Sequence, residues 1–225
     1  MTYYKLEPLV LQDKIVYNQI VGRTILHCDL NNFYASVEQK LHPEYDGMPL
    51  AVCGDPKARH GIVLAKNQLA KQAGVKTAET IWEAKQKCPE LVLVEPHFDE
   101  YVKYSKQVFE IYTSFTDRVE SFGIDECWLD VTGCERLFGD GKAIADTLRK
   151  TVKEKTGLTI SVGVSFTKTL AKLGSDLKKP DATTVLDEKH YMQIVGNMPP
   201  SEMIMVGKHT SEKLEKLNIR TIKDL

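Results

Sequence analysis

The chain has 225 residues, and its 42% hydrophobic and 27% charged residues are typical of a globular protein and too apolar for a disordered one. Thirty basic and 31 acidic residues leave a net charge of −1, which argues against a uniformly basic nucleic-acid-binding surface but permits a local basic patch. Five cysteines without a Cys-x-x-Cys pair argue against a disulfide scaffold or a zinc ribbon. Because no apolar run approaches the ~20 residues that cross a bilayer, we expect a soluble, cytoplasmic protein with no membrane partner.

Strand and helix patterns alternate through the first half of the chain. Residues 24–30 form a short apolar run typical of a buried strand. Phe33, Val37 and Leu41 then repeat at the four-residue spacing of one helical face, which predicts a helix over 31–41. The next expected elements are strands over 49–53, 61–65 and 91–94, and helices over 67–73 and 80–87.

The second half begins with the longest helical pattern, over residues 98–116. Two apolar segments, 118–124 and 127–131, are predicted to be strands joined by a tight turn at Asp125 and Glu126. The elements expected after them are a helix over 142–155, a strand over 158–164 and a helix over 168–177 that ends before Pro180.

The pattern changes after Asp187, where we place a domain boundary. Three short helical patterns follow, at 188–195, 200–203 and 210–217. A further helical pattern over 221–225 is still open at the last residue, and we interpret this as a cut within a longer protein.

The order of these elements indicates the fold class. The chain begins with a strand and a helix, continues through an inserted segment, and then has a long helix, a strand pair, a helix and a strand. This order is that of a split βαβ, ferredoxin-like sheet with an insertion after its first helix. We therefore predict an α+β fold whose sheet carries its helices on one face.

Two acidic features lie at predicted strand ends. Asp29 is near the end of the first strand, and Asp125 and Glu126 form the turn between two later strands. If these strands are neighbours, about 4.8 Å apart, the three carboxylates converge, and a divalent cation is the usual remedy for their repulsion. Hard oxygen ligands suit Mg²⁺ bound together with substrate phosphates. From spacing alone, a strand-end cap at Asp29 and a solvated turn at Asp125-Glu126 remain alternatives.

Three ordered motifs extend this hypothesis. The first is Asp-Leu-Asn-Asn-Phe-Tyr-Ala-Ser-Val-Glu from Asp29 to Glu38, and the second is Ile-Asp-Glu-Cys-Trp-Leu-Asp from Ile124 to Asp130. The third begins with Ser-Val-Gly-Val-Ser at 161–165 and continues to Lys-Lys-Pro at 178–180. Together they resemble the palm motifs of the Y-family translesion DNA polymerases, the group of DNA polymerase IV and UmuC-like enzymes, in register from about residue 24 to about 217.

The resemblance implies a domain organisation and a reaction. It implies an N-terminal extension over 1–21, a palm over 22–38 and 97–186, small α/β fingers over 39–96, and the start of a helix-hairpin-helix thumb over 187–225, without the family's little finger. Asp29, Asp125 and Glu126 would be catalytic, and with the backbone carbonyl of Leu30 they would hold two Mg²⁺ ions, for which Mn²⁺ can substitute. The implied reaction is attack of a primer 3′-hydroxyl on the α-phosphate of a dNTP, with release of pyrophosphate.

The resemblance also implies binding residues. Tyr34 matches the steric gate that excludes a ribose 2′-hydroxyl, and Lys179 matches a lysine that contacts the triphosphate. The full set of implied nucleotide-binding residues is Asn32, Phe33, Tyr34, Gln68, Lys71 and Lys179. Those implied to bind DNA are Lys168, Lys172 and Gly207.

The chain departs from the family pattern at its fingers motif, usually Asn-Tyr-x-Ala-Arg. It has Gln68 and Lys71 in place of the Tyr and Arg, and Ala65 in place of a small hydroxyl residue. Lys71 keeps the charge but lacks the bidentate fork of an arginine, and we expect Lys66 to compensate. In the thumb, only Gly207 remains of the usual Pro-Gly-x-Gly turn.

Template-directed synthesis on primer-template DNA is therefore the leading hypothesis, with a sliding clamp as a further partner of a C-terminal region. A polymerase-derived DNA-binding or accessory protein with weak or no catalysis is the first alternative. A nucleotidyl cyclase-type palm enzyme is the second, but it gives no reason for Tyr34 or for the Lys179-Pro180 pair.

Overall fold

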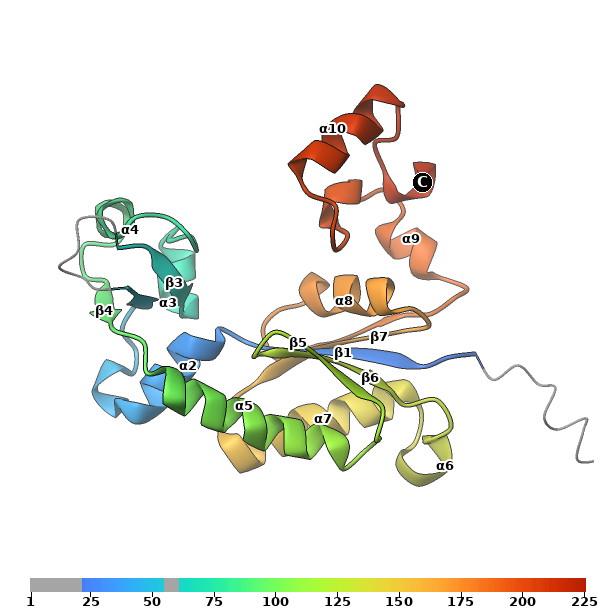
Figure 1. Ribbon diagram of the computed structural model, residues 1–225, viewed down its shortest axis with the longest axis horizontal. Helices are drawn as coiled ribbons and strands as arrows, with labels where there is room; N and C mark the ends of the chain where they lie inside the picture. Colours follow the sequence, from blue (N-terminus) through green and yellow to red (C-terminus); the bar gives the residue numbers. More distant parts are fainter. Residues whose placement is uncertain (1–21, 55–60) are drawn as a thin grey trace, which may run out of the picture.

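The computed structural model describes residues 22–54 and 61–225. These residues form a five-stranded sheet with its helices, an inserted unit around a three-stranded sheet, and a C-terminal helical part (Figure 1). The predicted N-terminal extension, residues 1–21, lies outside them. Within the described ranges, no helix combines the length and the apolar character needed to cross a membrane.

The larger sheet has the strand order β5-β6-β1-β7-β8. Its strands are β1 (Ile25–Leu30), β5 (Val119–Phe122), β6 (Glu126–Asp130), β7 (Ile160–Ser165) and β8 (Thr183–Leu186). β1 lies antiparallel between β6 and β7, and β5 is antiparallel to β6. This order and orientation confirm the predicted ferredoxin-like sheet. The sequence analysis missed β8, a four-residue edge strand that pairs parallel to β7 soon after Pro180.

Helices cover both faces of this sheet, so the prediction of helices on one face is wrong. α5 (Phe98–Thr113) and α7 (Gly141–Thr156) lie on one face, and α8 (Lys168–Leu177) lies on the other (Figure 1). Every residue of β1 and β7 is buried, as expected for strands with two covered faces. The short helix α6 (Glu135–Phe138) precedes α7.

The two faces of β1 have different neighbours because side chains alternate along a strand. Leu26, Cys28 and Leu30 belong to the main core beside α5 and α7, whereas Ile25 packs with Trp128 and Ala171 on the α8 side. His27 and Asp29 share the α8 face with Ile25. The strand therefore presents its polar side chains to α8.

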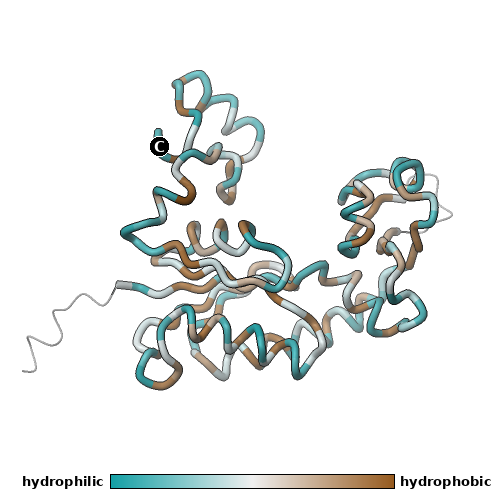
Figure 2. The backbone as a smooth tube through the Cα atoms, turned by 180° about the vertical axis from the view of Figure 1, so that it is seen from behind, coloured by the Kyte–Doolittle hydropathy of each residue, from teal (hydrophilic) through white to brown (hydrophobic). Residues whose placement is uncertain are grey.

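The inserted unit follows α2 (Phe33–Leu41) and precedes α5. Its strands are β2 (Leu50–Cys53), β3 (Val63–Lys66) and β4 (Val92–Val94), and its helices are η1 (Pro43–Tyr45), α3 (Gln68–Gln72) and α4 (Ile81–Lys87). The strand order is β3-β2-β4. Asn67 caps α3 by accepting a hydrogen bond from the Ala70 amide, and Thr80 and Glu83 form a capping box at α4. Figure 2 shows this unit standing beside the larger sheet.

The C-terminal part lies over α8, on the sheet face opposite α5 and α7 (Figure 1). Its elements are α9 (Tyr191–Val195), η2 (Pro200–Glu202), α10 (Lys208–Lys216) and η3 (Ile222–Asp224). Leu170 and Leu173 of α8 pack with Val195 and Ile222 in one apolar cluster. The predicted helical patterns of this part are confirmed in place, with short 3₁₀ turns at η2 and η3.

The close approach of α8 to β7 yields a stability prediction. A Cβ atom on Gly163 would lie 1.9 Å from the Ala171 carbonyl oxygen and 2.5 Å from the Ser175 amide nitrogen. We expect Gly163→Ala to lower the free energy of unfolding by about 3 kcal/mol, because backbone atoms must shift. The matched control is Gly22→Ala, since a Cβ there meets nothing within 4 Å and the expected change is below about 0.5 kcal/mol. Equal urea midpoints for the two variants would contradict this packing.

Candidate active site

The pairing of β1 with β6 brings the three predicted carboxylates to one end of the sheet. Asp29 lies directly opposite Glu126 in the antiparallel register. The Leu30 amide donates a hydrogen bond to the Asp125 carbonyl oxygen at 3.0 Å, which joins the turn to the strand end. Asp29 is only 6% exposed, so its charge is held largely away from water.

Two lysines, one in the middle of α8 and one just beyond its end, neutralise part of this charge. Lys172 Nζ lies 3.3 Å from Asp29 Oδ2 and 3.0 Å from Glu126 Oε2. Lys179 Nζ lies 2.6 Å from Asp29 Oδ2, and both ammonium groups also contact Asp176. Burial alone would lower the pKa of each lysine, but Asp29 and its neighbours outweigh it, and the pKa of both rises. Both lysines are therefore charged partners of the acidic cluster.

The structure thus places Lys172, implied above as a DNA contact, among the carboxylates. Its side chain is 15% exposed, which fits an internal counterion better than a surface phosphate contact. The sequence analysis also missed Asp176, one helical turn after Lys172. The signal was the i, i+4 spacing of these two residues on one helical face.

His27 is a third neighbour that the sequence analysis did not single out. It is completely buried, with Nε2 3.1 Å from Glu126 Oε2 and Nδ1 2.8 Å from the Ser175 hydroxyl oxygen. Its ring makes an edge contact with Trp128, with ring centroids 5.1 Å apart. The available signal was its position two residues before Asp29, which puts both side chains on the same face of β1.

The carboxylates differ in how readily they ionise. Burial and the negative charges of Asp29 and Glu126 raise the pKa of Asp125 from 3.8 to about 6. Burial acts in the same direction on Glu126, but the His27 ring and the Lys172 ammonium outweigh it and lower the pKa of Glu126 to about 2. Asp125 is also the one member of the trio that forms no ion pair with a described lysine, arginine or histidine. Excess negative charge is thus concentrated at Asp125.

The donor set fits a divalent cation of the magnesium type. Asp29, Asp125 and Glu126 supply hard carboxylate oxygens, and the raised pKa of Asp125 shows that a further positive charge beside it would be favourable. The carbonyl of Leu30, the predicted fourth ligand, belongs to the same strand end. The two lysine ammonium groups now lie among these oxygens, so cation binding requires them to move.

Tyr34 lies beside this strand end. Burial and the charge of Asp125 raise the pKa of the Tyr34 phenol, which shows that the two groups are close. The Tyr34 ring stacks on Tyr101, with centroids 4.2 Å apart and planes 10° from parallel. The structure buries Phe33 in the main core, and it puts Asn32 in the left-handed conformation before α2.

The predicted phosphate-binding residues of the inserted unit lie at α3. Gln68 and Lys71 belong to this helix, whereas Asn67 is turned inward, where it accepts from the Leu50 amide and donates to the Met48 carbonyl. Burial and the charge of Lys71 lower the pKa of Lys66, so these two ammonium groups are neighbours. Two lysine charges therefore lie near each other at this motif, and the compensating role of Lys66 stays a prediction.

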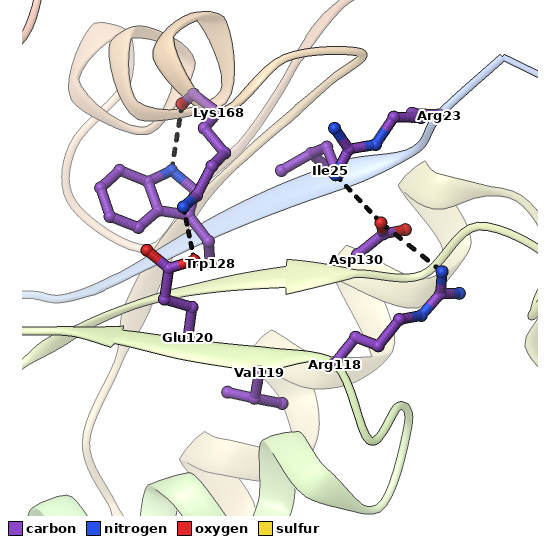
Figure 3. Close-up of a pocket in the computed structure, with 8 residues that line it drawn as sticks. All are labelled: Arg23, Ile25, Arg118, Val119, Glu120, Trp128, Asp130 and Lys168. Carbon is purple, nitrogen blue, oxygen red and sulfur yellow. Dashed lines mark hydrogen bonds and ion pairs between the residues drawn. The ribbon is translucent and has the colours of Figure 1, made fainter.

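Lys168 lies at the opposite end of the strand pair, beside a hollow of about 310 Å³ (Figure 3). Its ammonium lies 4.7 Å from the centre of the Trp128 ring and 2.5 Å from a Glu120 carboxylate oxygen. Asp130 in the same hollow pairs with Arg23 at 3.2 Å and Arg118 at 3.6 Å, which supports its interpretation as a structural residue.

Gly207, the other implied DNA contact, caps α10 in the C-terminal part. Gly207 is exposed, and a Cβ atom there would meet nothing within 4 Å, so the start of this helix is not crowded by neighbouring atoms of the described residues.

An α+β sheet of ferredoxin-like order, with a small inserted unit and an acidic strand end, is the architecture of a Y-family polymerase core. Residues 28–176 match the impB/mucB/samB family, and the chain belongs to that family. This confirms the resemblance given by the three motifs. The relatives and solved structures described below are named DNA polymerase IV, DinB or Dbh DNA polymerase, and none of these is a nucleotidyl cyclase.

Relatives of similar sequence carry the name DNA polymerase IV. One from Acetivibrio thermocellus is 55% identical over 203 residues, which are 90% of this chain and 51% of the relative. One from Bacillus velezensis is 40% identical over 204 residues, which are 91% of this chain and 49% of the relative. The chain therefore spans about half the length of the curated relatives it matches.

Two solved structures share the fold. DinB from Sulfolobus solfataricus matches with a TM-score of 0.80 and 28% identity, over 89% of this chain and 59% of that one. An insertion ternary complex of Dbh DNA polymerase matches with a TM-score of 0.81 and 29% identity over the same shares. These structures confirm the predicted α+β fold class.

The raised pKa of Asp125 predicts that the ionised Asp125 carboxylate lowers the free energy of unfolding, and that this effect depends on pH. Because the folded-state pKa lies above 3.8, the folded chain holds this proton more tightly, and the contribution of Asp125 to the free energy of unfolding falls as pH rises from about 4 to about 6. Asp125→Asn removes the ionised group, so at pH 7 and without divalent cations we expect a gain of about 1 kcal/mol, discounted for partial exposure. Urea unfolding at pH 4 and pH 7 measures it, and the gain should vanish at pH 4.

The matched control for this measurement is Asp130→Asn. Asp130 has a lowered pKa, since the Thr132 hydrogen bonds and the two arginines outweigh burial, and its substitution should reduce stability at pH 7. A loss of stability in Asp125→Asn at pH 7 would contradict the charge excess described above.

Proposed function

We propose that this chain is the catalytic part of a translesion DNA polymerase, which adds dNMP from a dNTP to a primer 3′-hydroxyl under the direction of a template. The observation that carries the proposal is the meeting of Asp29, Asp125 and Glu126 at one end of two adjacent central strands. The DNA polymerase IV relatives support it. Their origin in bacteria also supports action in the cytoplasm.

The proposed domain assignment follows the three parts of the fold. We assign residues 22–38 and 97–186 to the palm, 39–96 to the fingers and 187–225 to the start of the thumb. The insertion of a separate three-stranded sheet between α2 and α5 supports the first boundary. The change from sheet to short helices after β8 supports the second.

The carboxylates are proposed to hold two Mg²⁺ ions, with Mn²⁺ as a substitute. Asp29 and Asp125 would ligate both ions, and Glu126 and the Leu30 carbonyl would complete the set. When bound, such ions supply activation of the attacking hydroxyl and stabilisation of charge on the phosphates. Until then, Lys172 and Lys179 keep Asp29 and Glu126 ion-paired, and we propose that their ammonium groups turn toward the triphosphate when it binds.

Tyr34 is proposed to select the sugar. A phenol ring held flat against Tyr101 cannot easily tilt away, so a ribose 2′-hydroxyl that met the ring would be excluded by a steric clash. Gln68 and Lys71, helped by Lys66, would bind the phosphates from the fingers. A lysine ammonium contacts a phosphate as a single point charge, whereas the arginine of the usual family motif can form two parallel hydrogen bonds. We therefore expect weaker dNTP binding than the usual motif gives.

Primer-template DNA is the proposed macromolecular partner. The Dbh structure is described as a ternary complex, which supports binding of DNA and nucleotide together. Lys168 and the exposed Gly207 are candidate phosphate contacts, and Lys168 must first leave Glu120. A sliding clamp remains a proposed partner of the complete protein.

A DNA-binding accessory protein is the second candidate. Ala65, Gln68 and Lys71 favour it, because each departs from the family motif for triphosphate binding. The intact trio of Asp29, Asp125 and Glu126 opposes it.

Primer extension separates the two candidates. We expect this chain, joined to the remaining part of the Acetivibrio thermocellus relative, to extend a primer when Mg²⁺ or Mn²⁺ is present. Asp125→Asn should reduce the rate by at least about 1,000-fold, equivalent to ~4 kcal/mol of transition-state stabilisation. Asp130→Asn, the same change at the other end of the strand pair, should leave the rate within about threefold at a temperature where both variants are folded.

Two results would contradict the proposed polymerase. One is a folded, DNA-binding chimera that extends no primer while the relative itself does, which favours the accessory role. The other is extension that survives Asp125→Asn unchanged, which removes the assigned site.

A further inference from the structure

The chain crosses between its two sheets at two points that lie side by side. It leaves the larger sheet at the end of α2, where His42 is the C-terminal cap, and it returns at His97, the N-terminal cap of α5. Glu38 lies one turn before His42 on the same face of α2. The rings of His42 and His97 approach to 6.1 Å between centroids.

These three residues bring metal-ligating atoms together. Each offers one nitrogen or oxygen atom within 4.8 Å of the other two. His97 Nδ1 lies 3.0 Å from Glu38 Oε2 and 3.1 Å from Oε1. Across the part of the chain that the structure describes, no other trio of His, Cys, Asp or Glu is grouped this closely, and that includes the carboxylates of β1 and β6.

The Glu38 carboxylate is completely buried and poor in positive partners. It accepts hydrogen bonds from the Tyr101 hydroxyl and from the His97 amide, the latter at 3.3 Å. Among the described residues its one ion-pair partner is the His97 ring, which carries a charge only when protonated. A buried carboxylate is costly without a compensating cation, so this position favours one.

The surroundings of His42 complete the arrangement. Its Nδ1 lies 3.0 Å from Glu44 Oε1. A histidine that ligates a metal usually hydrogen-bonds a carboxylate through its other ring nitrogen, and this contact leaves Nε2 of His42 for the ion. The side chains of His42 and His97 are 36% and 51% exposed, so a solvent ion has an entry path and water can occupy a fourth position.

We propose that Glu38, His42 and His97 form a binding site for Zn²⁺ or a similar divalent transition metal, separate from the acidic strand end. Two imidazoles and one carboxylate, with an open fourth position, match a common zinc ligand set and suit Mg²⁺ poorly. Tetrahedral zinc ligands lie about 3.4 Å apart, so the exposed histidine rings need only a small rotation to close the site. The bound ion joins the two crossings and fixes the inserted unit to α2 and α5. This proposal does not depend on polymerase activity.

Calorimetric titration with Zn²⁺ in excess Mg²⁺ tests the site, because Mg²⁺ occupies hard oxygen ligands elsewhere. We expect one Zn²⁺ per chain. His42→Gln changes a half-buried side chain and His97→Asn an exposed one, and each should weaken binding by more than about tenfold. The control is His190→Gln, since His190 is also exposed and lies 2.8 Å from the Asp187 carboxylate but belongs to no such cluster.

Two further readouts identify the ligands. Zn²⁺ should raise the thermal unfolding midpoint of the native chain and of His190→Gln, but not of the two ligand variants, because it binds the folded state. Co²⁺ in place of Zn²⁺ should give the visible absorption of a nitrogen- and oxygen-ligated ion without sulfur charge-transfer bands.

Three results would overturn the proposal. They are the absence of Zn²⁺ binding, binding that is unchanged in His42→Gln and His97→Asn, and sulfur charge-transfer bands that assign the ion to cysteines. None of them bears on primer extension, so the proposed function would stand or fall separately.

Discussion

Mutual repulsion among three carboxylates at the end of β1 and β6 is the constraint on which the rest of the structure depends. Asp29 and Glu126 face each other across the strand pair, and the turn at Asp125 is hydrogen-bonded to the same strand. Such a group is stable without metal only if cations lie close to it. Lys172 and Lys179 provide them, and they come from α8 and the segment after it.

The position of α8 follows from this requirement. A helix that delivers lysines to the strand end must lie close to the sheet, and the absence of a side chain at Gly163 permits that approach. β7 is consequently covered on both faces, and the C-terminal part packs on the outer side of α8. The same helix, α8, thus brings a lysine to the acidic group and covers the second face of the sheet.

The sequence predicted the sheet better than it predicted what covers it. The ferredoxin-like class followed from the order of the elements, whereas the pairing of the Asp29 strand with the strand that begins at Glu126 was only a condition that the structure then met. The face occupied by α8 did not follow from this order, since it depends on a backbone contact at Gly163 that no periodicity reveals. His27 was missed because a single histidine in an apolar strand has no motif of its own, and its contact with Glu126 exists only after pairing.

A second chain of contacts links Tyr34, the proposed sugar gate, to the crossings between the sheets. Tyr34 stacks on Tyr101, the Tyr101 hydroxyl donates to Glu38, and Glu38 pairs with His97. The residue that faces the nucleotide in the proposed function is thus supported by the residues that connect the inserted unit. Under the proposed function, this chain of contacts couples rigidity at the crossings to the position of the Tyr34 ring.

A crystal structure with Mn²⁺ and a non-hydrolysable dNTP, read by anomalous scattering, tests most directly whether the acidic strand end is a divalent-cation site whose charge the two lysines partly neutralise. We expect manganese between Asp29 and Asp125, with the Lys172 and Lys179 ammonium groups displaced from the carboxylates toward the phosphates. Carboxylates that remain paired with both lysines, with no anomalous signal beside them at saturating Mn²⁺ and nucleotide, would contradict the account.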